Sequence, residues 1–118
     1  MARSPKELWG EIEKGLEAAS KLDGENMQAF LNLNETALKP GALDAKTKCI
    51  ICAAIALACN SEYCIAGRVR GALEAGASRQ ELVEAAAASR LMAGSLILGN
   101  NITLFFDSIN AFAPDYGK

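Results

Sequence analysis

The sequence has 118 residues, 51% of them hydrophobic and 22% charged, and its formal net charge is −2. This balance is typical of a globular chain and excludes a disordered one, and the length fits a single domain over residues 1–118. Because acidic and basic residues are interspersed, no basic face is expected to hold phosphates, and a nucleic-acid partner is excluded.

The first part of the chain predicts two helices. Ser4-Pro5-Lys6-Glu7 is a capping box with proline at the first helical position, and apolar residues then recur at helical spacing as far as residues 21–24. A second helix is predicted over residues 25–38, and Pro40-Gly41 ends it.

The middle of the chain predicts a third and a fourth helix. Asp44 is expected to cap the third helix, which runs through the uninterrupted apolar stretch 49–59. Because this helix is apolar on every side, we expect it at the centre of a bundle. Asn60-Ser61 interrupts it and caps a fourth helix from residue 62 to about residue 75, which Gly76 stops.

The last part of the chain predicts two more helices. Ser78-Arg79-Gln80-Glu81 is a capping box that opens a long fifth helix through residue 98. Gly99-Asn100-Asn101 is expected to break the chain before a short sixth helix from residue 102 to about residue 112. The sequence therefore predicts an all-α, six-helix bundle. A chain this short cannot cover two nearly all-apolar helices alone, so a symmetric homo-oligomer is expected.

The start of the chain and its apolar stretches favour a cytoplasmic protein. Residues 1–7 are polar and do not resemble a secretory signal. The longest apolar stretch, 49–59, has about half of the ~20 residues needed to cross a bilayer, so no membrane partner is predicted.

Four cysteines and no histidine limit the possible chemistry. In a cytoplasmic chain the cysteines are expected to be reduced, redox-active or metal-binding. The intervals between Cys49, Cys52, Cys59 and Cys64 do not match a zinc knuckle, so neither a metal nor another cofactor is predicted. Cys52 is expected to be buried and inert inside the apolar helix, and Cys59 to fill the core or cap at its end.

Three segments carry a resemblance to a known family: Leu43-Asp44-Ala45-Lys46-Thr47-Lys48 with the apolar helix behind it, residues 62–66, and residues 71–77. Together they resemble the core of the carboxymuconolactone decarboxylase and AhpD-like (alkylhydroperoxidase D) family, over about residues 43–98. The resemblance implies an all-helical AhpD-like fold that assembles as a homotrimer or homohexamer.

The redox branch of that family uses a glutamate, a Cys-x-x-Cys pair and a histidine, and the resemblance preserves only one of these four residues. Cys64 matches the second, peroxide-reacting cysteine, whereas Ser61 stands in place of the first, resolving cysteine. Arg68 replaces the histidine and cannot act as a base, because its guanidinium stays protonated. Cys49 replaces the glutamate. The family's mechanism therefore cannot be transferred intact.

Cys64 remains a credible nucleophile. It falls in the first turn of the fourth helix, where free amides and the helix dipole stabilise a thiolate, and Arg68 adds a positive charge four residues later. The alternative is a small buried hydrophobe. If the fold is right, Cys49 faces the same cavity, so a Cys49–Cys64 pair could replace the usual Cys-x-x-Cys; alternatively, Cys49 is an apolar filler in an inactive site.

Two classes of function stay open, and the sequence does not decide whether the protein is an enzyme. The first is a thiol-dependent peroxidase or disulfide oxidoreductase, with Cys64 as nucleophile, Cys49 as its partner and a small peroxide as substrate. The second is a non-redox member: a decarboxylase or isomerase of a small carboxylated lactone held by Arg68, or a catalytically degenerate protein that binds a ligand or partner. Ser61 and Tyr63 are further candidates for substrate binding, although Tyr63 could equally be a packing residue.

Overall fold

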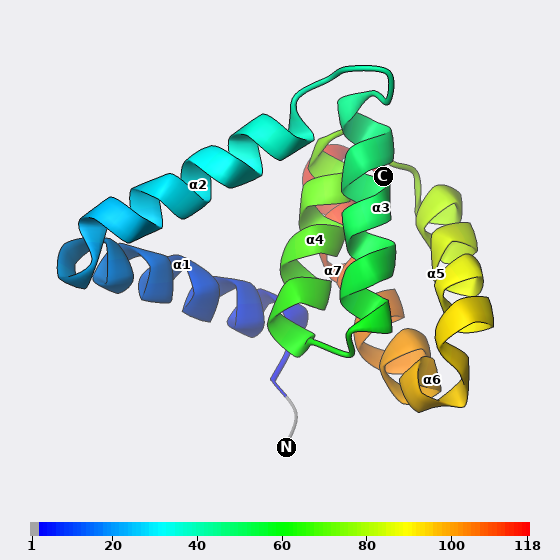
Figure 1. Cartoon of the computed structure of the whole chain (residues 1–118). Coiled ribbons are helices and arrows are strands. Elements are labelled where there is room, and N and C mark those ends of the chain that lie inside the picture. Colours follow the sequence, from blue (N-terminus) through cyan, green and yellow to red (C-terminus); the bar gives the residue numbers. More distant parts are fainter. Residues whose placement is uncertain (1–2) are drawn as a thin grey trace.

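The computed structural model describes residues 3–118, and this part of the chain is all-helical, as predicted (Figure 1). The five long helices are α1 (Pro5–Leu22), α2 (Gly24–Leu38), α3 (Ala45–Ala58), α4 (Glu62–Glu74) and α5 (Arg79–Ala93). The rest consists of η1 (Gly94–Ile97), α6 (Leu98–Asn100), the π-helical η2 (Asn101–Phe105), α7 (Phe106–Phe112) and η3 (Ala113–Tyr116). Because these short segments replace the expected single last helix, the count of six helices is not confirmed. Residues 1 and 2, part of the polar start, lie outside the described residues.

The predicted N-terminal caps of α1, α3 and α5 are present, whereas Ser61 at the start of α4 makes no capping hydrogen bond through its side chain. The Glu81 carboxylate accepts from the Ser78 N–H at 2.9 Å, and the Ser78 hydroxyl accepts from the Glu81 N–H at 3.0 Å, which completes the capping box of α5. The Asp44 carboxylate caps α3 by accepting from the Thr47 N–H at 2.7 Å, and hydrogen bonding to Thr47 lowers the pKa of Asp44. At α1 the Ser4 hydroxyl accepts from the Glu7 N–H at 3.2 Å, but the Glu7 carboxylate does not accept from the Ser4 N–H among the described residues, so the predicted capping box is only half formed.

The predicted end of the fifth helix is wrong. α5 ends at Ala93, because Gly94 adopts φ 78° and ψ −163°, a backbone conformation that essentially only glycine tolerates. The expected break at residues 99–101 is wrong as well, since helical turns continue from residue 98 to residue 112. Asn101 is fully buried there and accepts a hydrogen bond from the Arg90 guanidinium. Its Nδ2 group has no hydrogen-bond partner among the described residues. A buried asparagine whose side-chain oxygen is hydrogen-bonded can thus stay within a helical segment despite its preference for turns.

The core lies where α3 and α4 pack against each other and against α5, α7 and η2. Large, fully buried side chains from four of these elements fill it, together with Leu8 of α1 and Ile97 of η1: Leu57, Ile65, Leu73, Leu82 and Phe105. The composition of α3 predicted that this helix would be buried on every side at the centre of the bundle, and this prediction is wrong. One face is buried through Ala53 and Leu57, whereas Ile51 and Ile55 are exposed.

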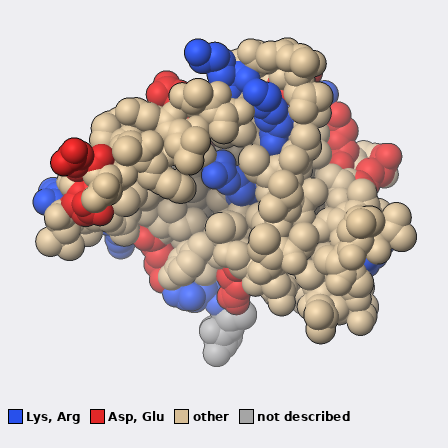
Figure 2. Space-filling view, in the orientation of Figure 1, with Lys and Arg blue, Asp and Glu red and all other residues tan. Residues whose placement is uncertain are grey.

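α1 and α2 form an arm that projects from this bundle (Figure 1). Leu8 anchors the start of α1 in the core, but α2 has no buried residue. The arm explains why the radius of gyration, 14.3 Å, exceeds the value of about 13.5 Å expected for a compact chain of this length. Figure 2 shows a hollow between the arm and the bundle, with basic side-chain atoms inside it.

One helical stretch, Arg79–Tyr116, is long and apolar enough by composition to cross a membrane. It is not a straight rod, however, because the chain turns at Gly94 and α7 packs back against α4. The stretch is therefore weak evidence for membrane insertion.

Candidate functional site

A cavity of about 570 Å³, here called the large cavity, lies between the arm and α4 and also reaches α3. Its walls on α1 and α2 are mainly apolar: Trp9, Ile12, Leu16, Phe30, Leu31 and Leu38. α3 and α4 contribute its sulfur and charged groups: Cys49, Cys64, Arg68, Arg70 and Glu74. The volume falls within the range of about 300–1,000 Å³ that small-molecule sites occupy.

The structure brings together four of the five residues that the sequence proposed for the site. Cys49, Tyr63, Cys64 and Arg68 all line the large cavity. Ser61 is not among the lining residues; it is the N-cap of α4, and its hydroxyl makes no capping hydrogen bond. The predicted convergence of Cys49 and Cys64 on one cavity is therefore observed, while the position of Ser61 favours a role in the start of the helix.

Cys64 lies at the accessible side of this site. It is the third residue of α4, in the helix's first turn, and it is exposed. Cys59, by contrast, lies at the C-terminal cap of α3, is exposed and lines neither of the two cavities described. Of the two positions expected for Cys59, the cap at the end of the apolar helix is observed and the core is wrong.

Cys49 lies on α3 and is half-buried. Burial raises the pKa of the Cys49 thiol, and the adjacent Cys52 raises it further, while the positive charge of Arg68 lowers it in part. At neutral pH the Cys49 side chain is therefore a thiol rather than a thiolate, ready to donate its proton but slow as a nucleophile.

Arg68 and Arg70 both line the large cavity but differ in what they contact. The Arg70 guanidinium pairs with the Glu74 carboxylate at 3.1 Å and lies 4.4 Å from the centre of the Trp9 ring. Arg68 is half-buried, and among residues 3–118 no side chain forms an ion pair or hydrogen bond with it. Arg68 is therefore the cation of the cavity that is free to receive an anion.

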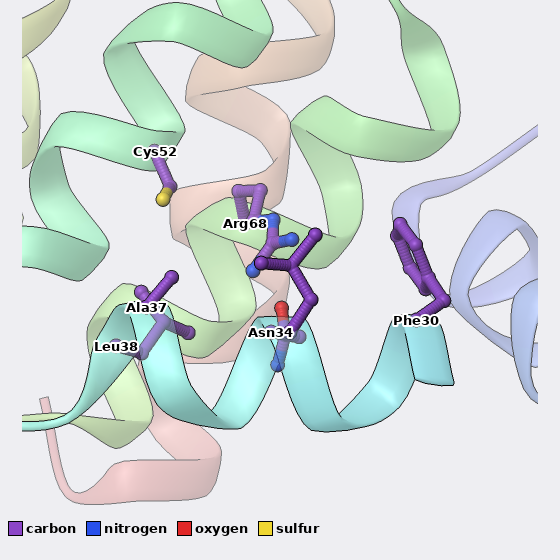
Figure 3. A pocket seen from close by; sticks show the side chains of 7 residues that line it. Phe30, Asn34, Ala37, Leu38, Cys52 and Arg68 are labelled. Carbon is purple, nitrogen blue, oxygen red and sulfur yellow. The ribbon is translucent and has the colours of Figure 1, made fainter. Parts of the chain in front are cut away.

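Arg68 also lines a second, smaller cavity of about 170 Å³, which adjoins the large one. Figure 3 shows its guanidinium and the Cys52 sulfur pointing into the same space, opposite Asn34 and Leu38 of α2. Cys52 is half-buried there, so the expectation that it is enclosed in an apolar helix holds only in part.

Tyr63 stands at the edge of the large cavity, and its hydroxyl is already engaged. It donates a hydrogen bond to the Glu11 carboxylate at 3.0 Å and accepts one from the Arg3 guanidinium at 3.2 Å. Tyr63 thereby ties the start of α4 to α1, which favours a positioning role over direct contact with a substrate.

The arm contributes residues to the cavity that the sequence motifs did not indicate. Trp9 on α1 and Phe30 and Asn34 on α2 line the cavity, although they lie outside the segments 43–98 that carried the resemblance. Helical spacing was the available signal, because residues 9, 12 and 16, and also 30, 34 and 38, each share one helix face.

Comparisons with known proteins agree with the resemblance and extend it to α2. Residues 24–97 match the profile of the Carboxymuconolactone decarboxylase family. A solved structure of an apo carboxymuconolactone decarboxylase family protein from Legionella pneumophila superimposes with a TM-score of 0.83 at 29% identity, covering 97% of each chain. A Thermotoga maritima member with a suggested role in the antioxidative response has a TM-score of 0.74 at 22% identity, covering 93% of this chain and 96% of that one.

A third match is a sequence relative, the uncharacterized protein 4 in the cox locus of Paracoccus denitrificans. It is 40% identical over 57 residues, which are 48% of this chain and 51% of that relative. The chain thus spans about half of that relative's length.

Proposed function

The chain belongs to the carboxymuconolactone decarboxylase family, and from this premise we propose that it is a thiol-dependent peroxidase in which Cys64 reduces an organic hydroperoxide. The observation that supports this most is that Cys64, Cys49 and Arg68 line one cavity, with Cys64 exposed. A nucleophilic thiol needs access, a nearby positive charge and a second thiol, and this arrangement offers all three.

The proposed reaction has two steps on the protein. The Cys64 thiolate attacks the terminal oxygen of the hydroperoxide, so that a sulfur–oxygen bond forms and the oxygen–oxygen bond breaks. The alkoxide leaves as an alcohol after taking a proton from water, which balances the proton that Cys64 released on forming the thiolate. Cys64 becomes a sulfenic acid. The sulfur of Cys49 then attacks that of Cys64, a disulfide forms, and the hydroxyl leaves as water with the proton from Cys49.

An external dithiol completes the cycle by reducing the Cys49–Cys64 disulfide to two thiols while it is itself oxidised to a disulfide. Arg68 is the residue proposed to stabilise the negative charge of the attacking thiolate and of the leaving alkoxide. Its permanent charge suits this role, although it cannot relay protons as the histidine of the family's redox branch does.

The test oxidises the reduced protein with one equivalent of cumene hydroperoxide and maps each cysteine by mass spectrometry. We expect a Cys49–Cys64 disulfide in the wild type, a trapped sulfenic acid on Cys64 in Cys49→Ser, and loss of rapid peroxide consumption in Cys64→Ser. Cys59→Ser is the matched control, because this exposed thiol lies outside both cavities. Peroxide consumption by Cys64→Ser at the wild-type rate would rule out the proposed nucleophile, and the absence of the disulfide would rule out the proposed pair.

A second candidate function is favoured by the unpaired Arg68. It is a non-redox member of the family: a decarboxylase or isomerase of a small carboxylated lactone, or a catalytically degenerate protein that binds a ligand or partner. In that case the guanidinium holds a carboxylate and Cys64 is dispensable. This candidate predicts peroxide consumption no faster than that of a free thiol in solution.

We extend the proposal to assembly and location. Exposed apolar side chains at the corner between α5 and η1 support self-association as a homotrimer or homohexamer, with Leu91, Met92 and Leu96 each more than 80% exposed. Four free cysteines suit a reducing compartment, which supports a cytoplasmic location.

A further inference from the structure

We propose that the large cavity binds an amphipathic monocarboxylate, with the carboxylate on Arg68 and an apolar body against α1 and α2. The inference rests on the proposed function for one point, namely that the bound molecule is a substrate. It narrows the proposed substrates to organic hydroperoxides that carry one carboxylate group. Binding itself needs no thiol chemistry, and it can therefore be tested separately.

The charge of the cavity selects the head group. Arg68 is half-buried and unpaired within residues 3–118, and a partly desolvated cation gains from an anionic partner. A planar guanidinium also matches a carboxylate with two parallel hydrogen bonds. The other cation, Arg70, is held by the Glu74 carboxylate at 3.1 Å and by the Trp9 ring. Of these two cations, Arg68 is thus the one available to a ligand's carboxylate. Two hydrogen bonds to a carboxylate use only part of the five N–H donors of Arg68, so the others remain for the charge at Cys64.

The walls of the cavity select the rest of the ligand. Three side chains of α1 and three of α2 present apolar surface on the side opposite α4: Trp9, Ile12, Leu16, Phe30, Leu31 and Leu38. When an alkyl or aromatic group covers these side chains, both apolar surfaces lose contact with water, and this favours binding.

The same walls disfavour a second acid group. A dicarboxylate would place its other carboxylate either against apolar side chains or beside Glu74, whose negative charge is already present at the cavity. A buried charge without a partner is costly, so a monocarboxylate should bind more tightly than a dicarboxylate of the same length. An amine with the same tail would be repelled by Arg68.

The sequence supplies a reporter for this test. Trp9 is the one tryptophan in the sequence, and it lines the large cavity. Its fluorescence is followed, together with the heat of binding, during titration with octanoate, octanol, octylamine, acetate and suberate. We expect saturable binding of octanoate and at least about tenfold weaker binding of the other four compounds, which lack the single acid, lack the tail or carry a second acid.

Variants assign the head group to Arg68. Arg68→Gln should weaken octanoate binding by about tenfold or more and remove the preference over octanol. Arg68→Lys keeps the charge and should retain that preference, which guards against a folding defect in the first variant. Lys14→Gln is the matched control, since it removes a positive charge from the exposed part of α1 outside the cavity, and its affinity should equal that of the wild type.

The outcomes separate this inference from the proposed peroxidase activity. Octanoate binding that depends on Arg68 and persists in Cys64→Ser supports the inference even if peroxide is not consumed, in which case only the peroxidase proposal fails. Equal affinity for octanoate and octanol, an unchanged affinity in a folded Arg68→Gln, or neither heat nor fluorescence change with octanoate would overturn the inference, whatever the peroxide assay gives.

Discussion

The Cys49 thiol faces two opposing influences. Burial raises its pKa, whereas Arg68 nearby favours the thiolate and so limits the rise. Because the net shift is upward, the thiolate of Cys49 is scarcer in the folded protein than in the unfolded chain at any pH near neutral. In the proposed peroxidase reaction, a partner thiol with a raised pKa would compete little with Cys64 for the peroxide.

This environment predicts the pH dependence of Cys49 alkylation. In the folded protein the midpoint of the rate-against-pH curve with iodoacetamide should lie above the ordinary thiol value of about 8.5, because the raised pKa keeps the proton on sulfur. In urea-unfolded protein the same cysteine should react at lower pH. Peptide mass spectrometry of timed samples measures both curves for the same residue. Coincident curves would contradict the effect of burial.

At the residue scale, the sequence predicted which side chains share one face of a helix. It did not predict which side chains meet when two helices pack together. Cys64 and Arg68 are four residues apart on α4, so their common face followed from spacing. That no carboxylate of residues 3–118 forms an ion pair with Arg68 depends on how α1 and α2 pack against α4. Likewise, the Tyr63 hydroxyl is bonded to Glu11, which lies 52 residues away in sequence, and no local pattern indicates that contact.

At the scale of the helices, the position at which α5 ends depends on one residue, Gly94. An isolated glycine within an apolar stretch is tolerated in a helix at a cost of about 1 kcal/mol, so Gly94 did not outweigh the helical pattern around it. Gly99-Asn100-Asn101 has a more turn-like composition, yet it stays helical because Asn101 is buried and bonded to Arg90. Capping residues, in contrast, act locally, and the predicted caps at Ser4, Asp44 and Ser78 are all present.

Alanine substitutions at Gly94 and at Gly15 should change the free energy of unfolding in opposite directions. No atom would clash with a Cβ at Gly94, so Gly94→Ala should lower the free energy of unfolding by about 1–3 kcal/mol through backbone strain alone. Gly15 lies in the middle of α1, and a Cβ there would also meet no atom. Gly15→Ala should therefore raise the free energy of unfolding by about 0.5–1 kcal/mol. Urea unfolding followed by circular dichroism measures both. Equal stability of Gly94→Ala and the wild type would show that the corner does not require glycine.

On the scale of the whole molecule, apolar surface remains uncovered where α5 meets η1. Leu91 is 82% exposed, and Met92 and Leu96 are each 86% exposed. The turn at Gly94 gathers these residues at one corner instead of continuing them along a longer helix. The sequence correctly indicated an excess of apolar residues on α3 and α5, because composition and length are sufficient for that argument. Which of them stay uncovered depended on the position of the turn.

The exposed apolar residues at this corner predict that the chain forms oligomers in solution. The wild type should sediment as an oligomer, and the double variant Leu91→Glu with Leu96→Glu should sediment as a monomer that keeps its helical circular dichroism. The reason is that each buried leucine contributes about 1.5–3 kcal/mol and each new glutamate would bring an unpaired charge into the interface. Leu22→Glu is the control, because this leucine is 89% exposed at the far end of α1. A monomeric wild type across the concentrations measured would contradict the prediction.

The outer wall of the large cavity is α2, the long helix in which no residue is buried. Its backbone amides should therefore open to solvent at a far lower free energy than those of α3 and α4, as a local unfolding unit of its own. A ligand that spans from Arg68 to Phe30 can bind only while α2 is in place. Each binding event then draws this helix into the cooperative unit of the bundle, and amide hydrogen exchange in α2 becomes a measure of how often the cavity is filled.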